Sequence, residues 1–296
     1  MYLLCRNVLL GLCVGWMTFS ASANVFFKVT HKNAPNAPPS YLLGTMHLLC
    51  KDEFQIPDQV YLSLVATEQL IVEVDITDTS ALMAARPAMF QQPRNYLKNH
   101  LNDAQYSLLE QQTQHHLQRS LATIAPLRPM IISSLFLANY LPCESETISV
   151  DETVITQAIS YNKPVLGLES AVWQLELFDQ IDLAEQVSAL YDIVADQQTA
   201  QQELTHMANA YLSGDGEKLN EIMNSQEDFL GASAIFLDQR NQTWAKQLPS
   251  ILAEKPSFIA VGAGHLYGEQ GLLTLLQAQG FQITPIPVRF GAVGKR

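Results

Sequence analysis

The feature that most restricts how this chain can fold is a pair of matching segments near its two ends, each an apolar run closed by glycine-x-x-histidine. The first motif, Gly44-Thr45-Met46-His47, follows the apolar residues 41–43, and the second, Gly262-Ala263-Gly264-His265, follows residues 258–261. With 14 glycines and 7 histidines in 296 residues, chance predicts only about 0.3 such spacings. Two of them, each after an apolar run, indicate two strands that end in tight turns and present imidazoles. We therefore expect distant parts of the chain to converge on one site.

The elements predicted around these motifs alternate between strands and helices at both ends of the chain. Strands are expected at residues 41–43, 70–76, 164–168, 258–261 and 282–288, and helices at residues 56–67, 151–161, 217–223, 236–252 and 269–279, with a further long helix beginning at residue 182. Residues 80–146 are predicted to be helical, with breaks at Pro126 and Pro129. This order predicts an α/β (α+β) fold in which N- and C-terminal α/β units form one mixed central sheet around a largely helical middle.

The first 23 residues have the composition of a signal peptide. Arg6 provides a basic start, residues 8–19 are apolar, and Ala21-Ser22-Ala23 fits a cleavage site, so the mature chain would begin at Asn24. The alternative is an uncleaved membrane anchor, but the apolar run is short for the roughly 20 residues that cross a bilayer. We therefore expect a periplasmic or secreted protein, with residues 24–296 as one domain and no membrane span after cleavage.

Charge restricts the partners of the chain. Its net charge is −12, and loss of Arg6 with the leader makes it one unit more negative. Nucleic acid and anionic lipid bind to clustered Lys and Arg side chains, which this sequence lacks, so we expect no nucleic-acid partner. The sequence also lacks a His-Glu-x-x-His zinc motif and a Gly-x-Ser-x-Gly nucleophile motif. A peptide or a small molecule is the expected ligand.

Two cysteines remain once the predicted leader is removed. Cys5 and Cys13 would leave with the leader, while Cys50 and Cys143 would stay in the mature chain. In an oxidising compartment an isolated pair is often a disulfide, and two buried thiols are the alternative. Neither cysteine lies in a recognisable catalytic context, so the sequence does not favour a thiol nucleophile.

Two imidazoles and one carboxylate are the predicted metal ligands. His47 and His265 would provide neutral imidazole nitrogens, and Glu73, a carboxylate in the apolar strand 70–76, would complete the set. Such a site binds a divalent ion (Mn, Co or Zn) and leaves open positions for water and substrate. The alternative is that both histidines only cap strand ends through hydrogen bonds to the backbone, and that Glu73 lies at an exposed strand end.

Four residues are predicted to act in catalysis: Glu73, Asp75, Glu169 and Arg240. Asp75 is two residues from Glu73 and shares its strand face, so it is a second candidate ligand or a group that orients a histidine. Glu169 follows the apolar strand 164–168 in a similar way. Arg240 lies in a helix with apolar flanks and would hold a substrate carboxylate or an oxyanion, with an ordinary surface arginine as the alternative.

Several of these segments resemble motifs of the TraB/PrgY/GumN family, which includes the animal Tiki proteins. The segments are 41–48, the acidic strand 70–75, Asp151 with 163–169, 210–215, Arg240-Asn241 and 261–271. The match that these spaced segments define extends over nearly all of the mature chain, and Glu73 takes the position of the family's glutamate. Gln239 departs from the arginine or glutamate expected before Arg240. The resemblance implies a fold shared with erythromycin-esterase-like and ChaN-like proteins and, through the Tiki proteins, a divalent-metal-dependent peptidase site at the two glycine–histidine turns.

Together these observations predict an exported divalent-metal-dependent hydrolase that acts on peptides. His47, Glu73 and His265 would hold the ion, which would lower the pKa of its bound water and polarise the scissile carbonyl. Asp75 or Glu169 would move the proton. Two alternatives stay open. One is a non-catalytic periplasmic protein that sequesters a peptide signal or haem at the same site, and the other is a hydrolase of esters or lactones.

Overall fold

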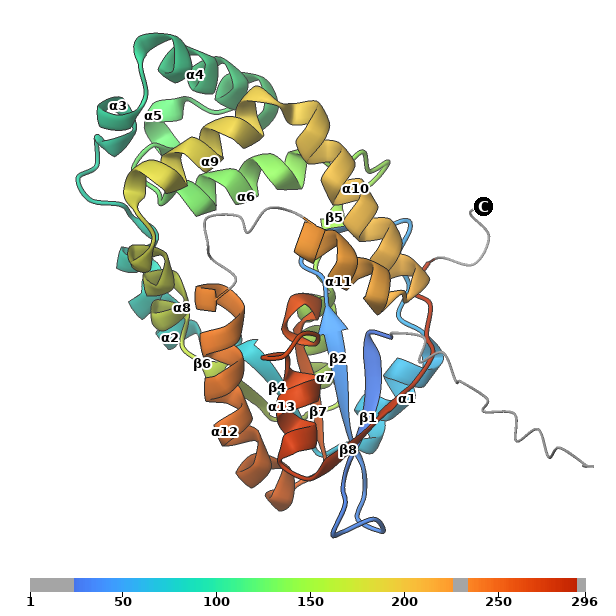
Figure 1. The fold of residues 1–296 in the computed structure, drawn as a ribbon. Coiled ribbons are helices and arrows are strands. Elements are labelled where there is room, and N and C mark those ends of the chain that lie inside the picture. The colour runs from blue at the N-terminus through green and yellow to red at the C-terminus, as the bar shows by residue number, and fades with distance from the viewer. Residues whose placement is uncertain (1–23, 226–233, 292–296) are drawn as a thin grey trace, which may run out of the picture.

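A computed structural model describes residues 24–225 and 234–291 of the chain (Figure 1). The predicted signal peptide and its cleavage site, which ends at Ala23, lie outside the described residues. No helix in the described part of the chain is long and apolar enough to cross a membrane.

The centre of the molecule is a six-stranded sheet in the order β6-β4-β7-β2-β1-β8. Its strands are β1 (Phe26–His31), β2 (Ser40–Thr45), β4 (Gln69–Val74), β6 (Val165–Glu169), β7 (Ser257–Gly262) and β8 (Phe281–Pro285). The four strands β6, β4, β7 and β2 are parallel to one another, whereas β1 is antiparallel to both β2 and β8. The prediction of an α/β fold with a mixed central sheet from both ends of the chain is confirmed.

Helices pack against both faces of this sheet (Figure 1). Among them are α1 (Asp58–Ala66) and α7 (Val150–Ser160) on one face, and α12 (Gln239–Glu254) and α13 (Leu272–Ala278) on the other. Leu43 of β2 points into the core with α1 and α7, and its neighbour Leu42 points into the core with α12 and α13. Because both faces are buried, the inner strands are continuous apolar runs rather than alternating ones.

The middle of the chain forms a separate, helical core that lies above the sheet in Figure 1. It is built from α3 (Tyr96–His100), α4 (Asp103–Leu117), α5 (Leu121–Ile124), α6 (Pro129–Tyr140), α9 (Leu183–Ala195) and α10 (Gln197–Ser213). Pro129 is the first residue of α6, a position at which proline needs no backbone N–H. The predicted helical middle is therefore confirmed.

Shorter elements connect these parts. Within the described ranges they are β3 (Leu49–Cys50), β5 (Thr147–Ile148), α2 (Thr79–Ala85), α8 (Ala171–Glu176), α11 (Gly216–Ser225), the 3-10 helices Arg86–Met89, Leu177–Gln180 and Ala263–His265, and the π-helix Ala234–Asp238. β3 and β5 pair as a two-stranded antiparallel ribbon.

The predicted strands do not include β1, and two of them extend too far at their C-terminal ends, since β8 ends at Pro285 and not at residue 288 and β4 is also shorter than predicted. Phe26 and Phe27 of β1 are both buried, one in each of the cores that flank the sheet, so the segment lacks the alternation that identifies a strand. β4 ends at Val74, so the prediction of a strand to residue 76 is wrong at this end. The reason is a turn, in which Asp75 Oδ1 accepts hydrogen bonds from the backbone N (2.8 Å) and Oγ1 (2.6 Å) of Thr77.

Cys50 and Cys143 form a disulfide, with an S–S distance of 2.08 Å and a Cα–Cα distance of 5.1 Å. The bond links β3 to the segment that follows α6. Of the alternatives that the sequence leaves open, the structure therefore has the disulfide and not two buried thiols.

Candidate functional site

The two glycine–histidine turns lie side by side at one end of the sheet. β2 and β7 are parallel neighbours, with Thr45 opposite Gly262. His47 therefore follows β2 at the same edge at which His265 follows β7, in the 3-10 helix Ala263–His265. The prediction that two distant parts of the chain meet at one place is confirmed.

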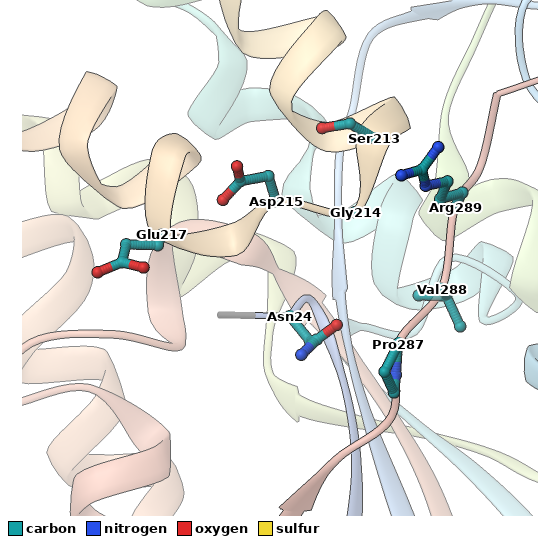
Figure 2. A pocket seen from close by; sticks show the side chains of 8 residues that line it. All are labelled: Asn24, Ser213, Gly214, Asp215, Glu217, Pro287, Val288 and Arg289. Atoms are coloured by element: carbon teal, nitrogen blue, oxygen red, sulfur yellow. The ribbon is translucent and has the colours of Figure 1, made fainter. Parts of the chain in front are cut away.

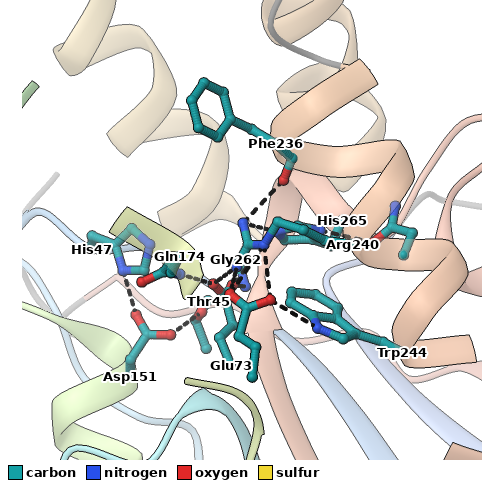
Figure 3. A network of polar contacts seen from close by, with 12 residues as sticks. Thr45, His47, Glu73, Asp151, Gln174, Phe236, Arg240, Trp244, Gly262 and His265 are labelled. Atoms are coloured by element: carbon teal, nitrogen blue, oxygen red, sulfur yellow. Dashed lines mark hydrogen bonds and ion pairs between the residues drawn. The ribbon is translucent and has the colours of Figure 1, made fainter. Parts of the chain in front are cut away.

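Arg240, near the start of α12, lies at the centre of the polar network in Figure 3. Its Nε donates to both carboxylate oxygens of Glu169 (3.1 and 3.2 Å), and Nη2 donates to Glu169 Oε1 (2.6 Å) and Glu73 Oε2 (2.5 Å). Nη1 donates to His265 Nε2 (3.0 Å) and to the backbone oxygen of Phe236 (3.0 Å). These contacts use every N–H bond of the guanidinium. The side chain is only 7% exposed, so Arg240 is a buried cation.

Glu73 in β4 connects Arg240 of α12 to the turn at the end of β7. Its Oε1 accepts the backbone N–H of Gly262 at 2.7 Å, and its Oε2 accepts from Gln174 Nε2 at 3.1 Å in addition to Arg240. Burial by itself raises the pKa of this carboxyl. The positive charge of Arg240 and the hydrogen bond from the Gly262 amide act in the opposite direction, and the pKa of Glu73 is lowered. Glu73 is therefore an ionised, fully hydrogen-bonded carboxylate rather than one at an exposed strand end.

Glu169, the last residue of β6, is the second carboxylate on Arg240. The indole Nε1 of Trp244 also donates to it, at 3.0 Å from Oε2. Burial raises the pKa of Glu169 and outweighs the opposite effect of the Arg240 guanidinium. Trp244 also lies under the guanidinium, with its ring 4.7 Å from the Arg240 Cζ, so α12 supplies both a cation and the apolar wall behind it.

His265 is buried and neutral. Its Nε2 must accept, because the partner there is the guanidinium of Arg240, so Nδ1 carries the proton and donates to Asn241 Oδ1 at 2.7 Å. Asn241 in turn donates its Nδ2 to the backbone oxygen of Gln270, at 2.9 Å, which fixes its orientation. Burial lowers the pKa of His265 to about 3. The ring is thus held in one tautomer with both nitrogens in use.

His47 has the opposite character. Its side chain is 70% exposed, and Nδ1 lies 2.9 Å from Asp151 Oδ2. The hydrogen bond to Asp151 outweighs desolvation and raises the pKa of His47 to about 9. Within the described residues Nε2 has no hydrogen-bond partner, so it is available to a ligand.

Asp151, near the start of α7, is held by two further donors. Thr45 Oγ1 donates to its Oδ1 at 2.5 Å, and Ser149 Oγ donates to its Oδ2 at 3.1 Å. Burial acts to raise the pKa of Asp151, but the hydrogen bonds from His47 and Thr45 lower it. Asp151 is a site residue that the predicted set does not contain, although the family resemblance includes it as a motif residue.

The structure thus brings together His47, Glu73, Glu169, Arg240 and His265 and adds several residues to them. Asp75 is the exception, because its carboxylate accepts hydrogen bonds from the backbone N and the Oγ1 of Thr77 and so stabilises the turn after β4. The added residues are Asp151, Gln174, Asn241 and Trp244. A sequence signal exists for Trp244, which lies four residues after Arg240 and so on the same helix face.

The predicted metal ligands do not fit a divalent ion in this arrangement. A metal ion would need lone pairs of His265 Nε2 and Glu73, and both groups direct them at the N–H bonds of Arg240. The described residues contain no group of three or more His, Cys, Asp or Glu side chains placed to hold a metal ion. Among the three predicted ligands only His47 has an uncommitted ring nitrogen. Metal binding therefore stays a prediction.

A separate cavity lies beside the loop between α10 and α11 (Figure 2). It is lined by Asn24, Ser213, Gly214, Asp215, Glu217, Pro287, Val288 and Arg289. None of these is a predicted site residue. Asp215 Oδ1 accepts the backbone N–H of Lys218 at 2.9 Å and so caps the first turn of α11, which is a structural role.

Comparison with known proteins gives a family and no described activity. The profile of the TraB/PrgY/gumN family matches residues 25–285. An "Uncharacterized protein YbaP" of Shigella flexneri is 25% identical over 245 residues, which are 82% of this chain and 89% of the relative. The protein of the same name from Escherichia coli K12 is 25% identical over 239 residues, or 80% of this chain and 87% of the relative. No solved structure matches the chain. The length of the profile match shows the family.

Proposed function

We propose that this chain, which belongs to the TraB/PrgY/gumN family, is an exported hydrolase that acts on peptides with His47 as its acid–base group. The observation that carries the proposal is the His47–Asp151 pair, with one imidazole nitrogen on a held carboxylate and the other open. Export agrees with the Cys50–Cys143 disulfide, since disulfides persist in oxidising compartments. The peptide substrate class comes from the resemblance to the Tiki proteins.

The proposed step is attack of water on the peptide carbonyl. Nε2 of His47 removes a proton from the water as the new C–O bond forms, and the resulting imidazolium gives a proton to the leaving amine as the C–N bond breaks. Asp151 keeps the ring in the tautomer with the proton on Nδ1 and stabilises the imidazolium. Because the pKa of His47 is about 9, the free base becomes more abundant as pH rises, and kcat/KM should rise with pH and level off above about 9.

In this proposal the buried residues Glu73, Glu169 and Arg240 hold the turn after β7 in place and take no part in the chemical step. Glu73 accepts the amide of Gly262 and so fixes the turn of the second motif, and Arg240 and Glu169 hold Glu73 in place. All N–H bonds of Arg240 go to protein acceptors, which leaves none for a substrate oxyanion in this arrangement. No step is routed through a metal ion, because two of the three predicted ligands, Glu73 and His265, direct their lone pairs at Arg240.

The test is hydrolysis of a mixed peptide library by the mature protein, with His47→Ala and a matched control. We expect His47→Ala to lower kcat/KM by about 10²-fold or more, the contribution of a general acid–base group. The control is His206→Ala, which removes an exposed histidine of α10 and should leave the rate unchanged. Thermal unfolding of each variant checks the fold.

Three outcomes would count against the proposal. Full activity in His47→Ala would remove His47 from the reaction. Cleavage of esters or lactones without cleavage of peptides would replace the substrate class but keep the site. Tight retention of a peptide or haem without turnover, by wild type and His47→Ala alike, would make the chain a binding protein.

A further inference from the structure

Three acceptor side chains converge on one buried point from three parts of the chain. Glu73 comes from β4, Glu169 from the end of β6 and His265 from the turn after β7, and their side chains are only 9%, 4% and 4% exposed. All three direct lone pairs at the guanidinium of Arg240 (Figure 3). Two carboxylates and a neutral imidazole are a donor set that divalent metals also bind.

We propose that the Arg240 guanidinium occupies the position at which a divalent metal ion would bind these three acceptors, so that the two cations exclude each other. The two cations would need the same lone pairs, those of Glu73 Oε2, Glu169 Oε1 and His265 Nε2. They would also repel each other at close range in a site with little water to screen them. The inference concerns metal binding alone and does not depend on whether the chain is a hydrolase.

The dimensions of the cluster agree with a guanidinium. The distances from Arg240 nitrogens to the three acceptors are 2.5, 2.6 and 3.0 Å. These are hydrogen-bond lengths, whereas a zinc ion holds oxygen and imidazole ligands at about 2.0–2.2 Å. The cluster is therefore spaced for N–H donors and would have to contract around an ion.

Removal of the guanidinium should turn the same residues into a metal site. Without Arg240, the buried carboxylates of Glu73 and Glu169 lose their countercharge, and an unpaired buried charge is strongly unfavourable. A divalent ion from solvent would restore the charge and meet the freed Nε2 of His265. His47 is not part of this set, since the hydrogen bonds of Arg240 go to Glu73, Glu169, His265 and Phe236 and not to His47. This ligand set therefore differs from the predicted set of His47, Glu73 and His265.

The experiment is calorimetric titration of the folded mature protein with MnCl₂ and, separately, ZnCl₂. We expect Arg240→Met, which keeps the length of the side chain but not its charge, to bind one equivalent at least about tenfold more tightly than wild type. Arg240→Lys keeps a cation and should stay close to wild type. In the Arg240→Met background, Glu169→Gln should abolish the gained binding, and His47→Ala should leave it intact.

Two results would overturn the proposal. One is Arg240→Met binding metal no more tightly than wild type, and the other is loss of the gained binding in the Arg240→Met, His47→Ala double variant. If Arg240→Met does not fold, wild type and His47→Ala decide the question. Absence of saturable one-equivalent binding by wild type up to millimolar metal supports exclusion. Saturable binding that His47→Ala removes refutes it.

Discussion

At the scale of single residues, His47 and His265 come from the same motif and have opposite ionisation. A hydrogen bond to Asp151 raises the pKa of His47 to about 9, and burial lowers that of His265 to about 3. The motif cannot show this difference, because Asp151 lies 104 residues further along the chain and His265 is enclosed by α12. The sequence identifies which histidines belong to the site, but their surroundings decide what each one can do.

Replacing Asp151 by asparagine should bring the pKa of His47 down toward its ordinary value of 6.5, because the hydrogen bond to Asp151 is the largest cause of the shift. A raised histidine pKa means that the pair stabilises the fold fully below pH 6.5 and loses this contribution as pH rises through about 9. Wild type should therefore lose stability relative to Asp151→Asn over that interval. The measurements are an NMR titration of the His47 ring and urea unfolding at several pH values.

The control for this prediction is Asp103→Asn, which removes an exposed aspartate at the start of α4. It should leave both the His47 titration and its effect on stability unchanged. A His47 pKa that stays near 9 in Asp151→Asn would mean that another group holds the proton.

At the scale of elements, a short ribbon sets the distance between His47 and Asp151. His47 lies just before β3 and Asp151 just after β5, and these strands pair with Leu49 opposite Ile148. The backbone N of Val150 also donates to the oxygen of Met46, at 3.0 Å. The Cys50–Cys143 disulfide closes the far end of the same ribbon. The two members of the pair are therefore fixed by elements and not only by their own hydrogen bond.

Removing the disulfide should loosen this ribbon. We expect the double variant Cys50→Ala, Cys143→Ala to lose about 2–5 kcal/mol of unfolding free energy, as is typical when a native disulfide is removed. The pKa of His47 should fall as well, because its partner is held less firmly. Urea unfolding and the NMR titration measure the two effects, and wild type in reductant should reproduce both. A stability loss without a change at His47 would show that the disulfide only crosslinks the chain.

The elements that could be predicted are those whose signal lies within one segment. The apolar runs before the two glycine–histidine turns indicate β2 and β7, and the structure pairs them. The start of α12 is less regular than the predicted helix 236–252, since the π-helix Ala234–Asp238 precedes it and places the oxygen of Phe236 on Arg240. Pairings such as β3 with β5, which position His47 and Asp151, depend on contacts between distant segments and leave no local pattern.

At the scale of the whole molecule, the helical middle and the C-terminal segment meet beside the first glycine–histidine turn. Tyr211 of α10 donates its hydroxyl to the backbone oxygen of Gly44 at 2.9 Å, and its ring stacks on Phe290, with centroids 4.9 Å apart. Phe290 also stacks on Phe54 at 5.9 Å, and its backbone oxygen accepts the N–H of Gln55 at 2.8 Å. The convergence of the chain ends predicted from the motifs thus extends beyond the strands to the last described residues.

Phe290 should therefore contribute far more stability than its place near the end of the chain suggests. Its side chain is fully buried, so Phe290→Ala should cost about 3–5 kcal/mol of unfolding free energy, through lost burial and the cavity left behind. Leu62→Ala is the control, because Leu62 is 64% exposed on α1 and its loss should change stability by less than about 0.5 kcal/mol. Urea unfolding compares the two. A small effect at Phe290 would mean that Tyr211 and Gly44 hold the helical middle against the sheet without the C-terminal segment.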